Sequence, residues 1–226
     1  MKKKAGLLFI TFGLLVKIIA GVFLWSNLYD ENRAGRHSAG ITQVFYEILQ
    51  SDAVQDNRAE NDQPNGHEAD YPISEDDIGY IEIDGAKYIG LISIPSLDVT
   101  LPVRIDWSYE TLKITPSRYS GHIDDNTLVV MAHNYSTHFA DIGGLPTGDR
   151  IILTDSNGMT HHYVVVTVTT IDPGSVFEVT NSIYDLTLFT CTIGGETRIV
   201  VRAMKIDSYP ILMCKIRQFL CNFIHL

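Results

Sequence analysis

The chain has 226 residues, of which 45% are hydrophobic, and a formal net charge of -10 at pH 7. Its length allows one domain with a buried core and additional segments. The first 27 residues contain four lysines and no acidic residue, so residues 28–226 carry 13 basic against 27 acidic side chains. This acidity argues against a nucleic-acid partner, which requires a basic face. Three cysteines without a Cys-x-x-Cys motif form neither a disulfide framework nor a zinc pattern.

The N-terminal segment has the composition of a membrane anchor. Three lysines at positions 2–4 precede Ala5–Trp25, a nearly continuous apolar run interrupted by Lys17. About 20 such residues span a bilayer, although a lysine at the centre costs about 2.5–3.5 kcal/mol unless it snorkels. A cleaved signal peptide is the alternative, but it has a shorter apolar region and a cleavage site, which is not evident after Trp25. We expect residues 1–27 to form a single-pass anchor in the cell membrane, with the N-terminus cytoplasmic and the remainder extracellular.

Two segments of different character follow the anchor. Residues 28–50 have apolar side chains at helical spacing, including Ile41, Val44, Phe45 and Ile48, which predicts a helical stalk. Residues 51–84 contain eleven acidic residues against one arginine, which predicts a disordered linker. No Asp-x-Asp-x-Asp-Gly loop accompanies these acids, so we expect no cofactor and leave calcium dependence open.

From residue 85 onward the pattern is mainly that of an all-β domain, which we expect to end at residue 207. Turn residues separate seven β-branched runs: Ile89–Ile94, Val99–Ile105, Thr127–Ala132, Arg150–Thr154, His162–Ile171, Leu186–Cys191 and Arg198–Met204. Many short strands without long helices between them predict a closed barrel or a sandwich. Short helices are expected at Trp107–Lys113 and Phe139–Leu145.

The last segment, residues 208–226, is apolar but contains three basic side chains, Lys215, Arg217 and His225. It is short and charged for a second membrane span. We expect an amphipathic C-terminal helix, with Cys214 and Cys221 on one face and no role assigned to them.

A predicted hairpin over Thr187–Arg202 contains the most informative residues. Strand alternation ends at Cys191, and a link with two consecutive glycines leads into a second strand that begins at Arg198. If Cys191 pairs with Arg198, their Cβ atoms lie about 5 Å apart on one face, and a cationic neighbour favours the thiolate. Arg202 then lies opposite Thr187, about 13 Å further along. Taken alone, a cysteine at a strand end is more often a small buried hydrophobe.

The residues of this hairpin resemble a known family. Thr187-Leu-Phe-Thr-Cys191, followed seven residues later by Arg198, is similar to the Thr-Leu-x-Thr-Cys…Arg signature of sortases, the cysteine transpeptidases of the Gram-positive cell surface. The run Thr127-Leu-Val-Val-Met-Ala-His133 supplies the upstream histidine of that family. Further matches at Ile92-Ser-Ile-Pro, Leu101-Pro-Val and Gly148-Asp extend the resemblance from about residue 88 to residue 205. The resemblance implies a closed eight-stranded β-barrel with short helices, preceded by the anchor.

The resemblance also implies a mechanism. Cys191 would attack the threonine carbonyl of a Leu-Pro-x-Thr-Gly-type sorting motif on a secreted protein, cleave it between Thr and Gly, and form a thioester. His133 would transfer protons to and from the two amines, and Arg198 would bind the substrate and the oxyanion. Thr190 would help to orient the substrate. The acceptor amine would belong to a cell-wall precursor or to a pilin lysine.

Several alternatives compete with this interpretation. The segment 172–185 is short, which disfavours the sortase class with a long helical insertion there. A pilin-polymerising sortase would have a lid before the barrel and a C-terminal span, and a non-catalytic wall-associated binding domain would not need the complete His, Cys and Arg pattern. A zinc site built from His122, His133 and His138 lacks a fourth ligand, so no metal is expected. The pair His161-His162 lies on a predicted strand and is a weaker candidate for catalysis.

Overall fold

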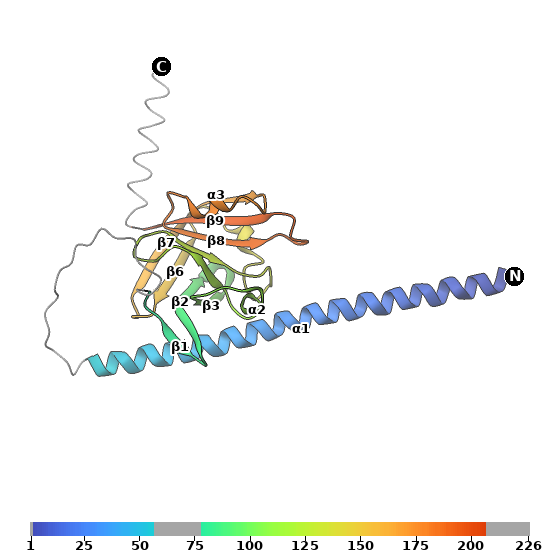
Figure 1. Cartoon of the computed structure of the whole chain (residues 1–226), viewed down its shortest axis with the longest axis horizontal. Coiled ribbons are helices and arrows are strands. Elements are labelled where there is room, and N and C mark those ends of the chain that lie inside the picture. The colour runs from blue at the N-terminus through green and yellow to red at the C-terminus, as the bar shows by residue number, and fades with distance from the viewer. Residues whose placement is uncertain (1, 57–77, 207–226) are drawn as a thin grey trace, which may run out of the picture.

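The computed structural model describes residues 2–56 and 78–206, and Figure 1 shows one long helix lying beside a β-barrel. The C-terminal segment, Cys214, Cys221 and most of the predicted linker lie outside the described residues. The strands are β1 (Ile81–Ile83), β2 (Ala86–Ile94), β3 (Val99–Arg104), β4 (Ser117–Ser120), β5 (Leu128–Met131), β6 (Arg150–Asp155), β7 (Thr160–Ile171), β8 (Leu186–Cys191) and β9 (Arg198–Lys205). The helices are α1 (Lys2–Asp56), α2 (Tyr109–Leu112) and α3 (Val176–Thr180), with short 3-10 turns η2 (Pro95–Leu97) and η3 (Ile142–Gly144).

The sheet closes into a barrel of eight strands, as predicted. The strand order is β1-β2-β3-β4-β5-β8-β9-β7-β6, and β6 pairs back onto β2. The pairs β3–β4 and β5–β8 are parallel and the others are antiparallel. β1 is a ninth strand outside the closed set, and it pairs only with the first residues of β2. Closure at β2–β6 depends on Gly90, because a Cβ atom there would lie 2.4 Å from the carbonyl oxygen of Thr154.

All seven predicted strands are present, within two or three residues at each end. Two further strands, β1 and β4, were not predicted. β1 has three residues and lies in the acidic region that was expected to be a linker, and β4 has the sequence Ser-Arg-Tyr-Ser, which lacks β-branched residues. The predicted helix near residue 107 is reduced to the single turn α2, which begins after a capping box formed by Ser108 and Thr111.

The barrel interior is filled by aliphatic side chains from every strand of the closed set except β4. Alternation along β8 directs Leu186 and Leu188 into this core, whereas Phe189 packs in a second cluster with Val129 and Val200. The side chains of β5, β8 and β9 that do not enter the core therefore form a partly covered outer face. The candidate site lies on this face.

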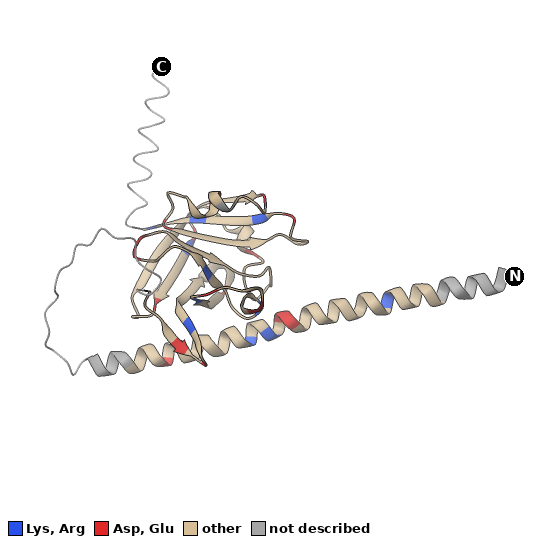
Figure 2. Ribbon diagram, viewed as in Figure 1, with Lys and Arg blue, Asp and Glu red and all other residues tan. Residues whose placement is uncertain are grey.

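The helix α1 is 55 residues long and continues through the predicted boundary between anchor and stalk. Its segment from Thr11 is long and apolar enough to cross a membrane by length and composition. Further along, Ala34, Ser38 and Phe45 are buried, and Phe45 packs in a cluster with residues of β1 and β2. The colours in Figure 2 show that charged residues of α1 gather near the barrel, whereas the stretch from Thr11 to Tyr29 contains one charged residue, Lys17.

Candidate active site

Three adjacent strands bring the predicted catalytic residues together. In the order β5-β8-β9, the central strand β8 ends at Cys191, and the register of β8 and β9 pairs Cys191 with Arg198, as predicted. On the other side, Met131 of β5 pairs with Phe189, and the backbone N–H of Ala132 donates to the Phe189 carbonyl at 3.2 Å. Two residues beyond Met131, His133 is therefore level with Cys191. With neighbouring strands about 4.8 Å apart, the cysteine lies between the histidine and the arginine.

These three residues line one cleft of about 190 Å³ on the outer face of the barrel. Its wall includes an aromatic series in which the ring centroids of Trp107 and Tyr119 are 5.8 Å apart and those of Tyr119 and Phe189 are 5.3 Å apart. Residues of the segment from Ile171 to Val179 also line the cleft, and Ile171 and Val179 pack in the same cluster as Phe189. The cleft is thus mainly apolar with a few polar groups, among them His133, Cys191 and Arg198, an arrangement typical of ligand-binding sites.

Cys191 is partly exposed, and it is a free thiol. The preceding residue, Thr190, is 1% exposed, and its hydroxyl donates to the carbonyl of Ala132 at 2.9 Å. Thr190 lines the cleft, but this hydrogen bond ties β8 to the residue before His133. Its predicted contact with substrate stays a prediction, and the structure gives it a role in holding Cys191 and His133 side by side.

Arg198 is held by the turn that follows Cys191. Its Nη1 donates to the carbonyls of Gly195 at 2.9 Å and Thr197 at 3.1 Å. The turn requires its two glycines, because Gly194 and Gly195 have φ values of 87° and 76°, in the left-handed region. Among the hydrogen bonds that the structure gives for Arg198, none uses Nε or Nη2, which leaves these donors for a ligand in the cleft.

Arg202 lies opposite Thr187, as predicted, and has different partners. Its Nη2 donates to the carbonyl of Glu178 at 2.9 Å, and its guanidinium lies 5.7 Å from the ring centroid of Tyr184. Arg202 is not among the residues that line the cleft. These contacts fasten α3 to the outer face of β9.

His133 is partly buried, and its Nε2 has no hydrogen-bond partner among the described residues. The ring stacks on Tyr135 at a centroid distance of 5.0 Å and an interplanar angle of 30°. Burial lowers the pKa of His133, and the positive charge of Lys113 lowers it further. The neutral imidazole is therefore favoured at neutral pH, and a neutral imidazole with a free nitrogen can accept a proton from a thiol.

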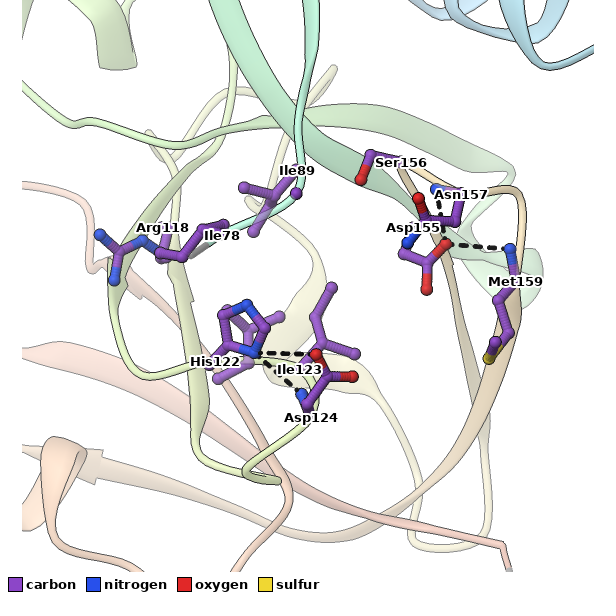
Figure 3. Close-up of a pocket in the computed structure, with 12 residues that line it drawn as sticks. Ile78, Ile89, Arg118, His122, Ile123, Asp124, Asp155, Ser156, Asn157 and Met159 are labelled. Atoms are coloured by element: carbon purple, nitrogen blue, oxygen red, sulfur yellow. Dashed lines mark hydrogen bonds and ion pairs between the residues drawn. The ribbon is translucent and has the colours of Figure 1, made fainter. Parts of the chain in front are cut away.

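The other histidines occupy different environments. His138 is 1% exposed, and burial, followed by the charge of His133, lowers its pKa to about 4. His122 lies in a second pocket, shown in Figure 3, where its ring approaches Asp124 at 3.3 Å. The three histidines considered for zinc thus do not converge, and within residues 2–56 and 78–206 no three His, Cys, Asp or Glu side chains are grouped as metal ligands.

The second pocket shares no lining residue with the cleft. Asp155 accepts hydrogen bonds from the backbone N–H groups of Asn157 and Met159, both at 2.9 Å (Figure 3). The other oxygen of its carboxylate lies 2.9 Å from Nε2 of His161. These bonds stabilise the turn between β6 and β7. The arrangement accounts for His161 as a structural residue.

Sequence reasoning missed two groups that bear on His133. Lys113 ends α2 and Tyr135 follows His133 by two residues. The only feature of the sequence that could have indicated the stacking of Tyr135 on His133 is that the two residues are two positions apart. No local pattern pointed to Lys113, because it approaches His133 only through the fold. The aromatic series was also not predicted, since Trp107, Tyr119 and Phe189 come from three separate segments.

Comparisons with known proteins agree with the fold. The sortase domain family model matches residues 92–206, about half of the chain. A Clostridium perfringens sortase D5 transpeptidase is 17% identical, with 77% of this chain and 99% of that chain covered and a TM-score of 0.52. Sortase A from Corynebacterium diphtheriae (lid mutant) is 23% identical over 53% of this chain and 70% of that chain, with a TM-score of 0.46.

A third solved structure, sortase C1 of the Group B Streptococcus pilus island 1, is 22% identical, with a TM-score of 0.46. The match covers 53% of this chain and 64% of the length of that sortase. No curated protein matches the sequence.

Proposed function

Because this chain belongs to the sortase family of cysteine transpeptidases, we propose that it cleaves a C-terminal sorting motif of the Leu-Pro-x-Thr-Gly type and transfers the acyl product to an amine. The observation that carries this proposal is the arrangement of His133, Cys191 and Arg198, level with one another on three adjacent strands and lining one cleft. Nucleophilic catalysis by cysteine needs a nearby base and an oxyanion donor, and the two flanking strands supply one each.

In the first half-reaction, the Sγ of Cys191 attacks the carbonyl carbon of the motif threonine. The thiol proton passes to the neutral imidazole of His133, whose lowered pKa keeps it available as an acceptor. The resulting imidazolium donates this proton to the departing glycine amine as the C–N bond breaks. A thioester between Cys191 and the threonine carbonyl remains.

In the second half-reaction, an acceptor amine attacks the thioester. His133 takes a proton from this amine, the C–S bond breaks, and the proton returns to the sulfur of Cys191. The enzyme regains its starting state, and the net change is the exchange of one amide for another. Water competes with the amine, so slow hydrolysis accompanies transfer.

Arg198 supplies the oxyanion donor in this scheme. Its Nη1 is fixed by two backbone carbonyls, which orients the planar guanidinium. A donor held in this way stabilises developing negative charge without reorganising during the reaction. The aromatic series and the wall from Ile171 to Val179 are suited to the leucine and proline of the motif, since both are apolar.

We also infer that α1 anchors the protein, with the N-terminus cytoplasmic and the barrel outside. The support is a long apolar helix preceded by three lysines. Secreted proteins bearing the motif would be the acyl donors, and an amine of the cell wall would be the acceptor.

The full chain in detergent, incubated with a Leu-Pro-x-Thr-Gly peptide, tests the proposal. Intact-mass spectrometry should show a thioester adduct that is absent in Cys191→Ala. The variants Cys214→Ala and Cys221→Ala should keep turnover near that of the wild type, because neither lies in the signature. Triglycine and a lysine peptide, offered as alternative acceptors, identify the amine. A wild-type protein that binds the peptide without forming an adduct would instead be a non-catalytic binding domain.

A further inference from the structure

The helix α1 contacts the loop that carries His133. We call residues 133–139 the histidine loop; it follows β5 and precedes η3. The α1 segment 31–38 lies against this loop, although the two are about a hundred residues apart in sequence. Three contacts join them, and each involves a different turn or face of the helix segment.

The first contact is made by Glu31. Its carboxylate accepts a hydrogen bond from the backbone N–H of Ser136, and its backbone carbonyl accepts one from the hydroxyl of Thr137 at 3.3 Å. A charged acceptor makes a stronger hydrogen bond to a backbone N–H than a neutral one. The tip of the histidine loop is thereby attached to the helix at one residue.

The second contact is the close approach of Gly35 to Thr137. A Cβ atom at Gly35 would lie 2.8 Å from Cγ2 and 3.1 Å from Cβ of Thr137. Such distances are shorter than van der Waals contact, so the helix and the loop approach closely because residue 35 is glycine. Gly40 lies five residues further along the same helix, and a Cβ atom built there would have no neighbouring atom within 4 Å.

The third contact is made by Ser38, which is 1% exposed. Its hydroxyl lies 2.8 Å from the carbonyl of Ile114, to which it donates, and 3.3 Å from Nε2 of His138. Because the Ser38 proton is donated to Ile114, Nε2 of His138 carries the ring proton and donates it to the Ser38 hydroxyl. Burial lowers the pKa of His138 to about 4, which keeps this ring neutral at physiological pH. Ser38 therefore joins α1, the segment after α2 and the end of the histidine loop.

These contacts reach His133 through the loop itself. The N–H of Phe139 donates to the carbonyl of His133 at 3.3 Å, which closes the loop on its first residue. The ring of Tyr135 lies 5.0 Å from that of His133 and 5.6 Å from that of His138, measured between centroids. A shift of residues 136–138 would therefore move the ring on which His133 stacks.

We propose that the α1 segment 31–38 is a positioning element for His133, with Gly35 and Ser38 as positioning residues that hold the imidazole level with Cys191. This inference rests on the proposed function for the catalytic role of His133. Attachment of the barrel to α1 does not by itself require these contacts, because the cluster around Phe45 already packs the helix onto β1 and β2. The contacts at residues 31–38 add a connection directed at the catalytic loop.

The consequence is that a displacement of α1 relative to the barrel would also displace the histidine loop and with it His133. Displacement of a reacting group by about 1 Å can lower a rate by about 10²-fold. The walls of the peptide cleft contain no residue of α1, so a displaced histidine loop should lower kcat and leave KM nearly unchanged. This division between kcat and KM separates positioning from a general loss of structure.

The test compares Gly35→Ala with Gly40→Ala in the full chain in detergent. Both changes replace a helical glycine and favour the helix by a similar amount, but only Gly35→Ala introduces an atom against Thr137. We expect kcat to fall at least tenfold in Gly35→Ala, with KM within twofold of the wild type, and no change in Gly40→Ala. Adding Thr137→Ser to Gly35→Ala removes the methyl group nearest the new Cβ and should restore most of kcat.

A second measurement does not depend on any substrate. In ¹³C-histidine-labelled protein, NMR titration follows the His133 ring, assigned by its loss in His133→Gln. Because burial is the main cause of its lowered pKa, displacement of the loop in Gly35→Ala should raise this pKa toward its ordinary value, while Gly40→Ala leaves it unchanged. The charged or titratable groups near the ring are Lys113 after α2, Tyr135 and His138 in the loop, and Cys191 and Arg198 in the cleft. Asp30 and Glu31 on α1 act on Tyr135. All of these groups are retained in both variants.

The two measurements separate the possible failures. If the wild type forms no adduct with any peptide, the proposed function fails, and the His133 titration still decides whether α1 holds the loop. If Gly35→Ala remains folded with an unchanged His133 titration and an unchanged kcat, the positioning role is wrong. The same conclusion follows if Gly35→Ala and Gly40→Ala lose activity equally, because the effect would then lie in the helix and not in its contact with the loop.

Discussion

The catalytic arginine can be identified by comparing Arg198 with Arg202. Both residues lie on the same face of β9, so side-chain direction does not distinguish them. The register does, because Arg198 pairs with Cys191 whereas Arg202 pairs with Thr187. Four residues of strand place Arg202 about 13 Å further along, and its Nη2 is already bonded to the Glu178 carbonyl.

The expected magnitude follows from these positions. Removing one donor to a transition-state oxyanion costs about 10²–10³-fold in kcat, or roughly 2.7–4 kcal/mol. Arg198→Ala should show a loss in this range. Arg202→Ala should stay within about threefold of the wild type, since a partly exposed contact at that distance contributes little to the reaction. Arg198→Lys retains the charge but not the planar fork, so it should also be slow.

The assay is kcat/KM for one sorting peptide with each variant of the full chain in detergent. Arg198→Ala also removes two hydrogen bonds to the turn after Cys191, so the melting temperature must be measured in parallel. Formation of a mixed disulfide between Cys191 and a methanethiosulfonate reagent, with release of methanesulfinate, reports whether the thiol remains accessible. The role assignment is refuted if a folded Arg202→Ala variant loses more activity than Arg198→Ala.

Two further predictions concern pH and topology. Removing the positive charge in Lys113→Gln should raise the pKa of His133 and move the acid limb of the kcat/KM profile to higher pH. The shift should be larger at low salt than at high salt, and Lys87→Gln serves as a control. A profile that does not move at low salt would show that Lys113 and His133 are uncoupled. Protease added to intact protoplasts should remove the domain beyond residue 78 while the apolar part of α1 stays with the membrane, and protection of the barrel would contradict the proposed orientation.

The hairpin around Cys191 could be predicted because its determinants are local. Two glycines favour the reversal, and strand alternation indicates which residues share a face. The exact register stayed a condition of the prediction, and the structure supplies it by pairing Cys191 with Arg198. The side-by-side position of His133 was predicted only through resemblance to a family. Physically it depends on the parallel pairing of β5 with β8, which no local pattern encodes.

The features that were missed depend on long-range contacts or on short elements. β4 contains no β-branched residue and is stabilised mainly by its pairing with β5. The contact between Ser38 and His138 spans 100 residues, and the helical pattern at residues 41–48 gave no indication that the preceding turn would pack on a catalytic loop. By contrast, the helical stalk was expected, and α1 continues without interruption from the residues expected to be the anchor into those expected to be the stalk.

The strand order also determines how much of the chain must be synthesised, starting from the N-terminus, before the catalytic residues can be brought together. The helix α1, β1, β2 and β3 are complete before residue 105, and their pairings are short-range. The nucleophile strand β8 has β5 on one side and β9 on the other, and β9 ends at Lys205. A nascent chain can therefore pair β1, β2 and β3 early, but Cys191 has no arginine beside it until β9 has been synthesised. The barrel and its cleft are thus completed only when almost the whole domain has been made.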